Sequence, residues 1–204
     1  MKRIYKRLYT LTYFPSLVPL KVSDILHGTD FAGIVRDGNE DGRFEYMPSP
    51  VFSFPSLRRY INKNMHGGRG HSVLDIGCGK GLVLRFFKSL KFDTVSGIEY
   101  EKRLCHIARK NLKSAAGKIK VYRADAAEFS MYENYDTFYL YNPFDGKTLE
   151  KCADKIIATL DMNPRKLTVF YCNPVYADIL KNKGFKEEAR FYYKTSFFVF
   201  HGEK

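Results

Sequence analysis

From about residue 72 onward, the sequence alternates short runs of β-branched and aromatic residues with longer segments in which apolar residues recur every three or four positions. The short runs predict strands, and the longer segments predict helices. Strands that alternate with helices form a parallel sheet whose crossover helices cover its faces. Strands are expected at residues 72–76, 94–99, 119–122, 136–141 and 166–171, and helices at 82–90, 103–113 and 148–160.

The pattern changes after the fifth expected strand. Pro174 can open a helix that Gly184 closes, because glycine tolerates the backbone conformation that ends a helix. Residues 185–193 and 196–201 are two strand-like runs separated by a short turn, which predicts an antiparallel hairpin. The expected fold class is therefore α/β: a doubly wound, seven-stranded, mostly parallel sheet with a C-terminal antiparallel hairpin strand.

The first 70 residues do not join this alternation. We expect residues 1–70 to form an N-terminal extension or lid, while residues 71–204 form the main domain. Within the extension, residues 54–64 carry apolar residues at helical spacing, which predicts a helix. Residues 37–42 are charged and contain two glycines, which predicts a loop.

Composition limits the cellular setting. Of the 204 residues, 45% are hydrophobic, which is enough to fill one core. The four cysteines form neither a C-x-x-C pair nor a zinc-ligand cluster, so a reduced, cytoplasmic protein without a metal site is expected. The basic residues Lys2, Arg3, Lys6 and Arg7 begin a segment that lacks signal-peptide features, and we expect a frayed, solvated terminus there. Since no run of about 18 apolar residues occurs, we expect no membrane span.

The formal net charge of +12 favours contact with nucleic acid, because basic side chains displace counterions from phosphates. The excess is spread evenly. Residues 1–70 hold 11 basic and 6 acidic residues, residues 71–143 hold 12 and 8, and residues 144–204 hold 11 and 8. An even spread is typical of a solvated surface. Folding can still gather lysines on one face, so a nucleic-acid partner stays open.

The most informative segment is residues 73–81, with the sequence VLDIGCGKG. The expected strand leads into three glycines, which are followed by an expected helix. Glycine lets backbone approach a ligand closely, and a helix N-terminus presents free N–H groups, so a polar ligand is expected here. The spacing G-x-G-x-G differs from the G-x-G-x-x-G of dinucleotide-binding proteins, which disfavours a nicotinamide-dependent reductase.

With its acidic residue followed by G-x-G-x-G, this segment resembles the first motif of the class I S-adenosylmethionine-dependent methyltransferases. The resemblance covers roughly residues 72–200 and implies S-adenosyl-L-methionine as the cofactor. It assigns Asp75 to the cationic amino group of the methionine part and the glycine loop to close backbone contact. The cofactor-binding residues implied within the loop are Gly77, Cys78, Gly79 and Gly81. The Cys78 side chain itself is expected to pack, since a small side chain is all that this position requires.

Two further acidic residues follow expected strands in the family's order. Glu99 ends the second strand, 24 residues after Asp75, which places both carboxylates at one rim of a parallel sheet. The resemblance assigns Glu99 to the ribose hydroxyls and Tyr100 to the adenine ring. After the third strand it assigns Asp125 to the adenine amine and the backbone of Ala126 to a ring nitrogen. Taken alone, Asp125 is equally well explained as a helix N-cap.

The fourth expected strand ends in the sequence YLYNPF, where the resemblance places the methyl acceptor. Amine methyltransferases of this class often carry [ND]-P-P-[YFW] here, and this chain has N-P-F, one proline short. Asn142 and Phe144 are therefore the expected catalytic residues, and Asn142 also borders the cofactor. A cap on the following helix is the alternative explanation for Asn142. An amide, a carbonyl and a ring beside the methyl group favour a nitrogen acceptor.

The function expected from these motifs is methyl transfer from S-adenosyl-L-methionine to a nitrogen of a protein side chain or small molecule. An RNA or DNA methyltransferase and a non-catalytic cofactor-binding module are the alternatives. Acceptor specificity is expected to lie largely in residues 1–70. Within them, residues 44–50 resemble a segment that can fold over the cofactor in relatives of this class. Their Y-x-P-[ST] element is similar to one in small bacterial enzymes and in some lysine-directed protein methyltransferases, and simple packing of Tyr46 on the sheet is the alternative. The sequence does not indicate an oligomeric state.

Overall fold

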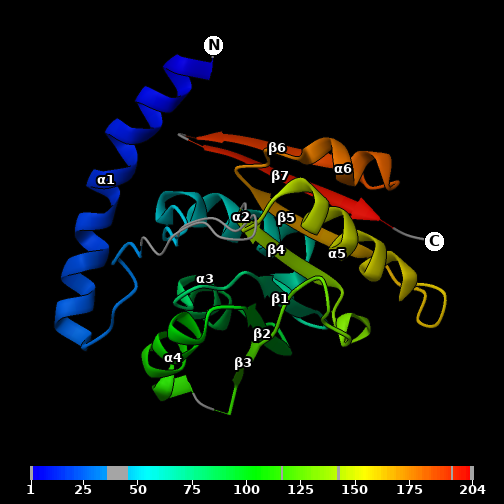
Figure 1. Ribbon diagram of the computed structural model, residues 1–204, viewed down its shortest axis with the longest axis horizontal. Helices are drawn as coiled ribbons and strands as arrows, with labels where there is room; N and C mark the ends of the chain where they lie inside the picture. The colour runs from blue at the N-terminus through cyan, green and yellow to red at the C-terminus, as the bar shows by residue number, and fades with distance from the viewer. Residues whose placement is uncertain (1, 36–45, 116, 142, 194, 203–204) are drawn as a thin grey trace.

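The computed structural model describes residues 2–35, 46–115, 117–141, 143–193 and 195–202. Its strands form one seven-stranded sheet in the order β3-β2-β1-β4-β5-β7-β6 (Figure 1). The strands are β1 (Ser72–Ile76), β2 (Thr94–Glu99), β3 (Ile119–Arg123), β4 (Thr137–Tyr141), β5 (Leu167–Cys172), β6 (Lys186–Tyr193) and β7 (Thr195–Gly202). The α-helices are α1 (Lys2–His27), α2 (Phe54–Asn64), α3 (Leu82–Lys88), α4 (Lys102–Asn111), α5 (Gly146–Ala158) and α6 (Ala177–Asn182).

The first five strands are parallel, which confirms the predicted α/β class. β1 lies at the centre, with β2 on one side and β4 on the other. Asp75 of β1 is in register with Gly97 of β2 and with Tyr139 of β4. The chain therefore reverses its winding direction beside β1, and such a point is where open parallel sheets bind ligands at their carboxyl ends.

The C-terminal hairpin extends the sheet on the β5 side. β7 runs antiparallel to β5, with Phe170 opposite Val199, and β6 pairs with β7 in the same sense. The register between β6 and β7 shifts between Glu187 and Ala189, which is a local irregularity near the start of the hairpin. The hairpin lies at the edge of the sheet opposite β3 and away from the strand ends that follow β1 and β2.

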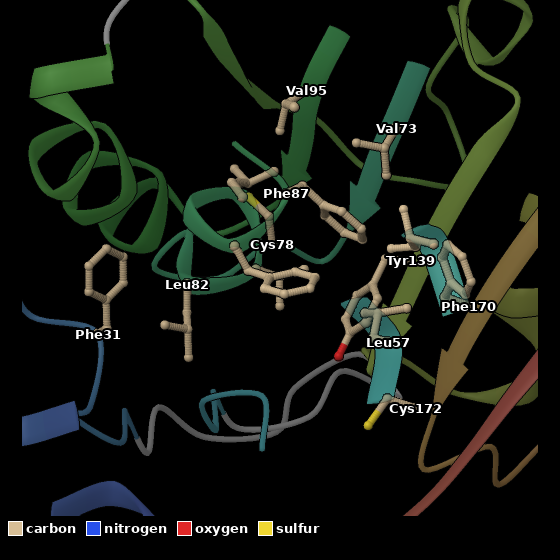
Figure 2. Packing of buried hydrophobic residues seen from close by; sticks show 14 of the residues in the cluster. Phe31, Leu57, Val73, Cys78, Leu82, Phe87, Val95, Tyr139, Phe170 and Cys172 are labelled. Atoms are coloured by element: carbon tan, nitrogen blue, oxygen red, sulfur yellow. The ribbon is translucent and has the colours of Figure 1, made fainter. Parts of the chain in front are cut away.

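Two hydrophobic clusters cover the two faces of the sheet, because successive residues of a strand point to opposite sides. Val73 and Tyr139 pack on one face with residues of α1, α2 and α3. Leu74 and Phe138 pack on the other face with residues of α5 and α6. Figure 2 shows the first cluster, in which side chains from β1, β2, β4 and β5 meet those of α2 and α3. Helices on both faces make the sheet doubly wound.

Helix α1 was not predicted from the sequence. Its side chains Tyr13, Leu17 and Leu20 are buried in the first cluster, and the Tyr13 hydroxyl donates to the Pro48 carbonyl at 2.7 Å. The helix ends before Gly28, whose positive φ of 64° suits a glycine after a helix. Packing of one apolar face thus stabilises a helix that contains two prolines.

Asp24 fixes the turn that follows α1. Its buried carboxylate accepts hydrogen bonds from the Thr29 hydroxyl and from the backbone N–H groups of Phe31 and Ala32.

α5 starts two residues earlier than predicted, because Asp145 caps it by accepting from the backbone N–H of Thr148 at 2.9 Å. Over the described ranges, the structure contains no helix long and apolar enough to cross a membrane.

Candidate active site

A cavity of about 660 Å³ lies at the carboxyl ends of β1, β2 and β4. The loops that follow these strands form most of its wall, as the reversal of winding beside β1 predicts. The N-terminal extension contributes Tyr46, Met47 and Ser49 to the lining. The lining brings together the following predicted site residues: Asp75, Gly77, Cys78, Gly79, Glu99, Tyr100, Asp125, Ala126 and Phe144.

The glycine loop needs glycine for both conformation and space. Gly77 and Gly79 have positive φ values of 78° and 52°, which other residues rarely adopt. A Cβ on Gly77 would lie 2.4 Å from the Cβ of Pro143, and a Cβ on Gly79 would lie 2.2 Å from Cε2 of Tyr46. The Cys78 side chain packs into the first hydrophobic cluster beside Gly97 (Figure 2). The loop thus presents backbone to the cavity.

Asp75 supplies a buried carboxylate to the cavity wall. Its side chain is 2% exposed, and its Oδ2 atom has no hydrogen-bond partner among the described residues. Burial raises the pKa of Asp75 well above its usual value, and the nearby charge of Glu99 raises it further. An unpartnered buried carboxylate oxygen is costly in the absence of a ligand. The site therefore favours a ligand that brings a cation or a hydrogen-bond donor to Asp75.

Glu99 holds the glycine loop in addition to lining the cavity. Its Oε2 accepts from the backbone N–H of Gly79 at 2.9 Å, and its Oε1 accepts from the backbone N–H of Glu101 at 2.8 Å. Burial raises the pKa of Glu99, while these backbone hydrogen bonds act in the opposite direction. The sequence predicted this carboxylate at the rim but not its contact with Gly79, which depends on how two loops approach each other.

Asp125 begins the turn after β3 and lies in the same lining. Its Oδ1 accepts from the backbone N–H of Ala127 at 2.9 Å, and the Ala126 carbonyl accepts from the Tyr132 hydroxyl at 2.8 Å. These bonds fix the backbone of the turn toward the cavity. Tyr100 follows β2, is 43% exposed and also lines the cavity.

Three further predicted residues, Gly81, Phe144 and Asn142, differ in how they relate to the cavity. Gly81 does not belong to the described lining: it starts α3 with φ 84°, and a Cβ there would lie 2.8 Å from Cδ1 of Leu112. Glycine is needed at this position because the loop packs closely on the segment after α4. Phe144 is buried and lines the cavity. Asn142 lies outside the described residues.

Tyr46 covers the glycine loop from the N-terminal extension. Its ring lies against Gly79, and its hydroxyl donates to the Phe31 carbonyl at 3.0 Å. Burial raises the pKa of Tyr46 well above its usual value, so the hydroxyl stays protonated and remains a donor. The extension therefore forms part of the cavity, in addition to packing on the sheet.

Lys80 and Asp30 join the same extension to the glycine loop. Lys80 is 2% exposed, and its Nζ donates to Oδ2 of Asp30 at 2.7 Å, while Asp30 is half-exposed. Asn111 completes the junction: its Oδ1 accepts from the Asp30 N–H at 2.8 Å, and its Nδ2 donates to the Lys80 carbonyl at 3.0 Å. The sequence did not predict this junction, because Lys80 occupies a variable position of the motif and Asp30 lies 50 residues earlier in an unpatterned segment.

Residues 73–163 match a family model described as "Methyltransferase domain". The match includes the glycine loop and all three strand-end carboxylates. Residues 73–163 therefore form a methyltransferase domain, as the resemblance of the glycine motif predicted. This methyltransferase is an S-adenosylmethionine-dependent enzyme, so the predicted family and cofactor are confirmed. A comparison with curated proteins found no match.

Solved structures share the fold of this methyltransferase. The ribosomal protein L11 methylase of Lactobacillus delbrueckii subsp. bulgaricus has a TM-score of 0.59 at 13% identity, over 79% of this chain and 81% of that one. The precorrin-6y C5,15-methyltransferase of Geobacter metallireducens has a TM-score of 0.55 at 16% identity, over 72% and 87%. At these identities the likeness concerns the fold.

Proposed function

We propose that the enzyme holds S-adenosyl-L-methionine across the carboxyl edge of its sheet, with Asp75, Glu99 and Asp125 as polar anchors. The unpartnered Oδ2 of Asp75 suits the ammonium group of the methionine part. Each Glu99 oxygen that accepts a backbone N–H has a second lone pair for a ribose hydroxyl. The turn after β3 offers the Asp125 carboxylate and the backbone near Ala126 to the adenine.

The bound cofactor supplies an electrophilic methyl group on a sulfonium. The enzyme's own residues then orient the acceptor and exclude water from the reacting atoms. Tyr46, from the N-terminal extension, and Phe144, from the loop after β4, are among the aromatic residues that line the cavity. We assign residues 1–70 to an extension that closes the cavity, and residues 71–204 to the catalytic domain.

The acceptor we propose is a nitrogen of a protein side chain or a small molecule. The observation that carries this proposal is the position of the N-P-F segment, since Pro143 and Phe144 both line the cavity and Pro143 lies against Gly77. An aromatic ring and a carbonyl beside the methyl position suit an amino group, which needs a flat apolar contact and a hydrogen-bond acceptor. Asn142 is proposed to accept a second hydrogen bond from that amino group.

We also propose that the enzyme is cytoplasmic, which is supported by its four buried free cysteines.

The acceptor class is tested by incubating the enzyme with methyl-labelled cofactor and fractionated lysate. Label in protein or in small molecules, bound to nitrogen after hydrolysis, supports the proposal. Label found only in RNA or DNA would contradict the proposed acceptor and support a nucleic-acid methyltransferase, the alternative that the net charge of +12 favours.

Asn142→Ala is expected to lower turnover of the labelled acceptor by at least about tenfold, because the acceptor loses a hydrogen bond that orients it. Affinity for S-adenosylhomocysteine, measured by calorimetry, is expected to change much less than turnover. Met162→Ala is the control, since Met162 is 92% exposed and does not belong to the described lining. Unchanged turnover in Asn142→Ala would remove this residue from the proposed acceptor site.

A further inference from the structure

Helix α1 carries an exposed apolar stripe along the face opposite to its packed face. Val18, Val22, Ile25 and Leu26 are 61%, 51%, 74% and 75% exposed. These positions repeat every three or four residues, so they share one side of the helix. The buried side chains Tyr13, Leu17 and Leu20 occupy the other side. Exposed apolar side chains that gather in one stripe mark an interaction surface.

The same spacing continues toward the N-terminus in the sequence. Ile4, Leu8, Leu11 and Pro15 precede Val18 at intervals of four, three, four and three residues. The sequence periodicity of the stripe thus continues along the whole length of α1, from Lys2 to His27. In Figure 1, the N-terminal part of α1 extends beyond the sheet and its other helices. The stripe therefore belongs to an element that projects from the molecule.

The N-terminal residues of the chain carry charge of one sign. Residues 1–23 contain five basic residues and no acidic residue. The basic residues are Lys2, Arg3, Lys6, Arg7 and Lys21. Asp24 is the first acidic residue, and it is buried with its carboxylate bound to backbone N–H groups. A helix that combines an exposed apolar stripe with a basic N-terminal sequence fits a surface that is apolar within and anionic at its edge.

We propose that α1 docks this methyltransferase on the surface of an anionic membrane. A helix with apolar and basic sides lies in the plane of a bilayer, with its apolar side among the acyl chains and its basic side chains at anionic headgroups. A second copy of α1 would bring five further basic residues against this surface without an acidic partner. Pro15 and Pro19, both exposed, also disfavour close packing against another helix.

The turn that follows α1 connects the proposed docking helix to the cavity wall. The turn after α1 is held by Asp24 and leads to Asp30, which pairs with Lys80 of the glycine loop. Phe31 in the same turn accepts the hydrogen bond of Tyr46, whose ring lies on Gly79. The docked helix is thus joined to the cavity wall by a short series of contacts.

The test is flotation of the full-length enzyme with vesicles of pure phosphatidylcholine or of phosphatidylcholine with about one third phosphatidylglycerol. We expect binding to the anionic vesicles only, weakened when salt is raised from about 0.05 to about 0.5 M. Replacing Val22, Ile25 and Leu26 together by Ser is expected to weaken this binding by at least about tenfold. Replacing the four basic residues among positions 2–7 by Gln is expected to act similarly.

The matched control replaces Met162 and Val175 by Ser, because both are exposed apolar residues outside α1, at 92% and 59%. This control is expected to bind vesicles like the unchanged protein. Equal flotation of the α1 variant and the unchanged protein would overturn the proposal, as would failure to bind anionic vesicles. A concentration-dependent dimer that the same α1 variant dissociates would instead assign the stripe to a second copy. Unfolding temperatures verify that every variant folds.

Discussion

Asp75→Asn is expected to stabilise the ligand-free enzyme and to weaken its binding of S-adenosylhomocysteine by at least about 30-fold. The two effects have one cause. In the free enzyme the Asp75 carboxylate is buried with Oδ2 unpartnered, so its charge opposes folding. With the ligand bound, the same charge faces an ammonium group, and removing it leaves that cation buried and unpaired. Calorimetric titration and thermal unfolding measure the two effects separately.

The stabilising effect of Asp75→Asn should depend on pH. Because the pKa of Asp75 is raised in the folded state, the folded protein binds this proton more tightly than the unfolded chain does. The contribution of Asp75 to stability is therefore full at low pH and is lost as pH rises through the raised pKa. The advantage of the Asn variant should grow with pH and reach a few degrees, about 2–4 °C for each kcal/mol. An Asp75→Asn variant that is less stable than the unchanged enzyme at neutral pH, or that binds S-adenosylhomocysteine normally, would contradict the assignment of Asp75 to the ammonium group of the ligand.

Asp30→Asn is expected to lower the free energy of unfolding by about 3 kcal/mol, because it leaves the buried Lys80 ammonium without its carboxylate. This loss lies at the lower end of the range for breaking a buried ion pair, because Asp30 is half-exposed and the Tyr46 ring remains 5.4 Å from Nζ of Lys80. The unfolding temperature should fall by roughly 6–12 °C. Lys80→Met should cost less, because an apolar side chain fills the site and Asp30 can face water. The double variant should recover much of the loss of Asp30→Asn.

Asp154→Asn is the matched control for that series. Asp154 pairs with Lys183 at 2.6 Å on the surface, where Lys183 keeps Glu150 as a second partner at 3.2 Å. Its removal is expected to leave the unfolding temperature nearly unchanged. Similar losses in Asp154→Asn and Asp30→Asn, or no recovery in the double variant, would show that burial of Lys80 does not control the junction. Ligand affinity should fall in Asp30→Asn as well, since the junction positions the glycine loop.

The part of the fold that follows residue 72 was predictable because each strand there is a short apolar run bounded by turn residues. β1 and β2 have the predicted bounds, 72–76 and 94–99. The position of Asp75 and Glu99 at one rim follows from the same regularity, since parallel strands end on the same side. The spacing of the glycines also predicted the class of ligand, because all residues of that motif lie close together in the sequence.

The extension was not predictable on the same grounds. Pro15 and Pro19 weaken the helical signal of α1, and the helix is stabilised by Tyr13 and Leu17 packing on distant elements. The role of Lys80 depends on Asp30, and no periodicity relates the two positions. Long-range polar contacts of this kind leave no pattern in a single sequence. They emerge only when the chain is folded.

The contact of Tyr46 with Gly79 has a consequence for how this enzyme can change over generations. The ring occupies the space that any side chain at position 79 would need, 2.2 Å from the place of its first carbon. We therefore expect the two positions to change together, although one lies in the extension and the other in the cofactor loop. Descendants that enlarge position 79 must first shorten position 46. Exchange of the extension between related enzymes should succeed only where the donor keeps a side chain that fits over glycine.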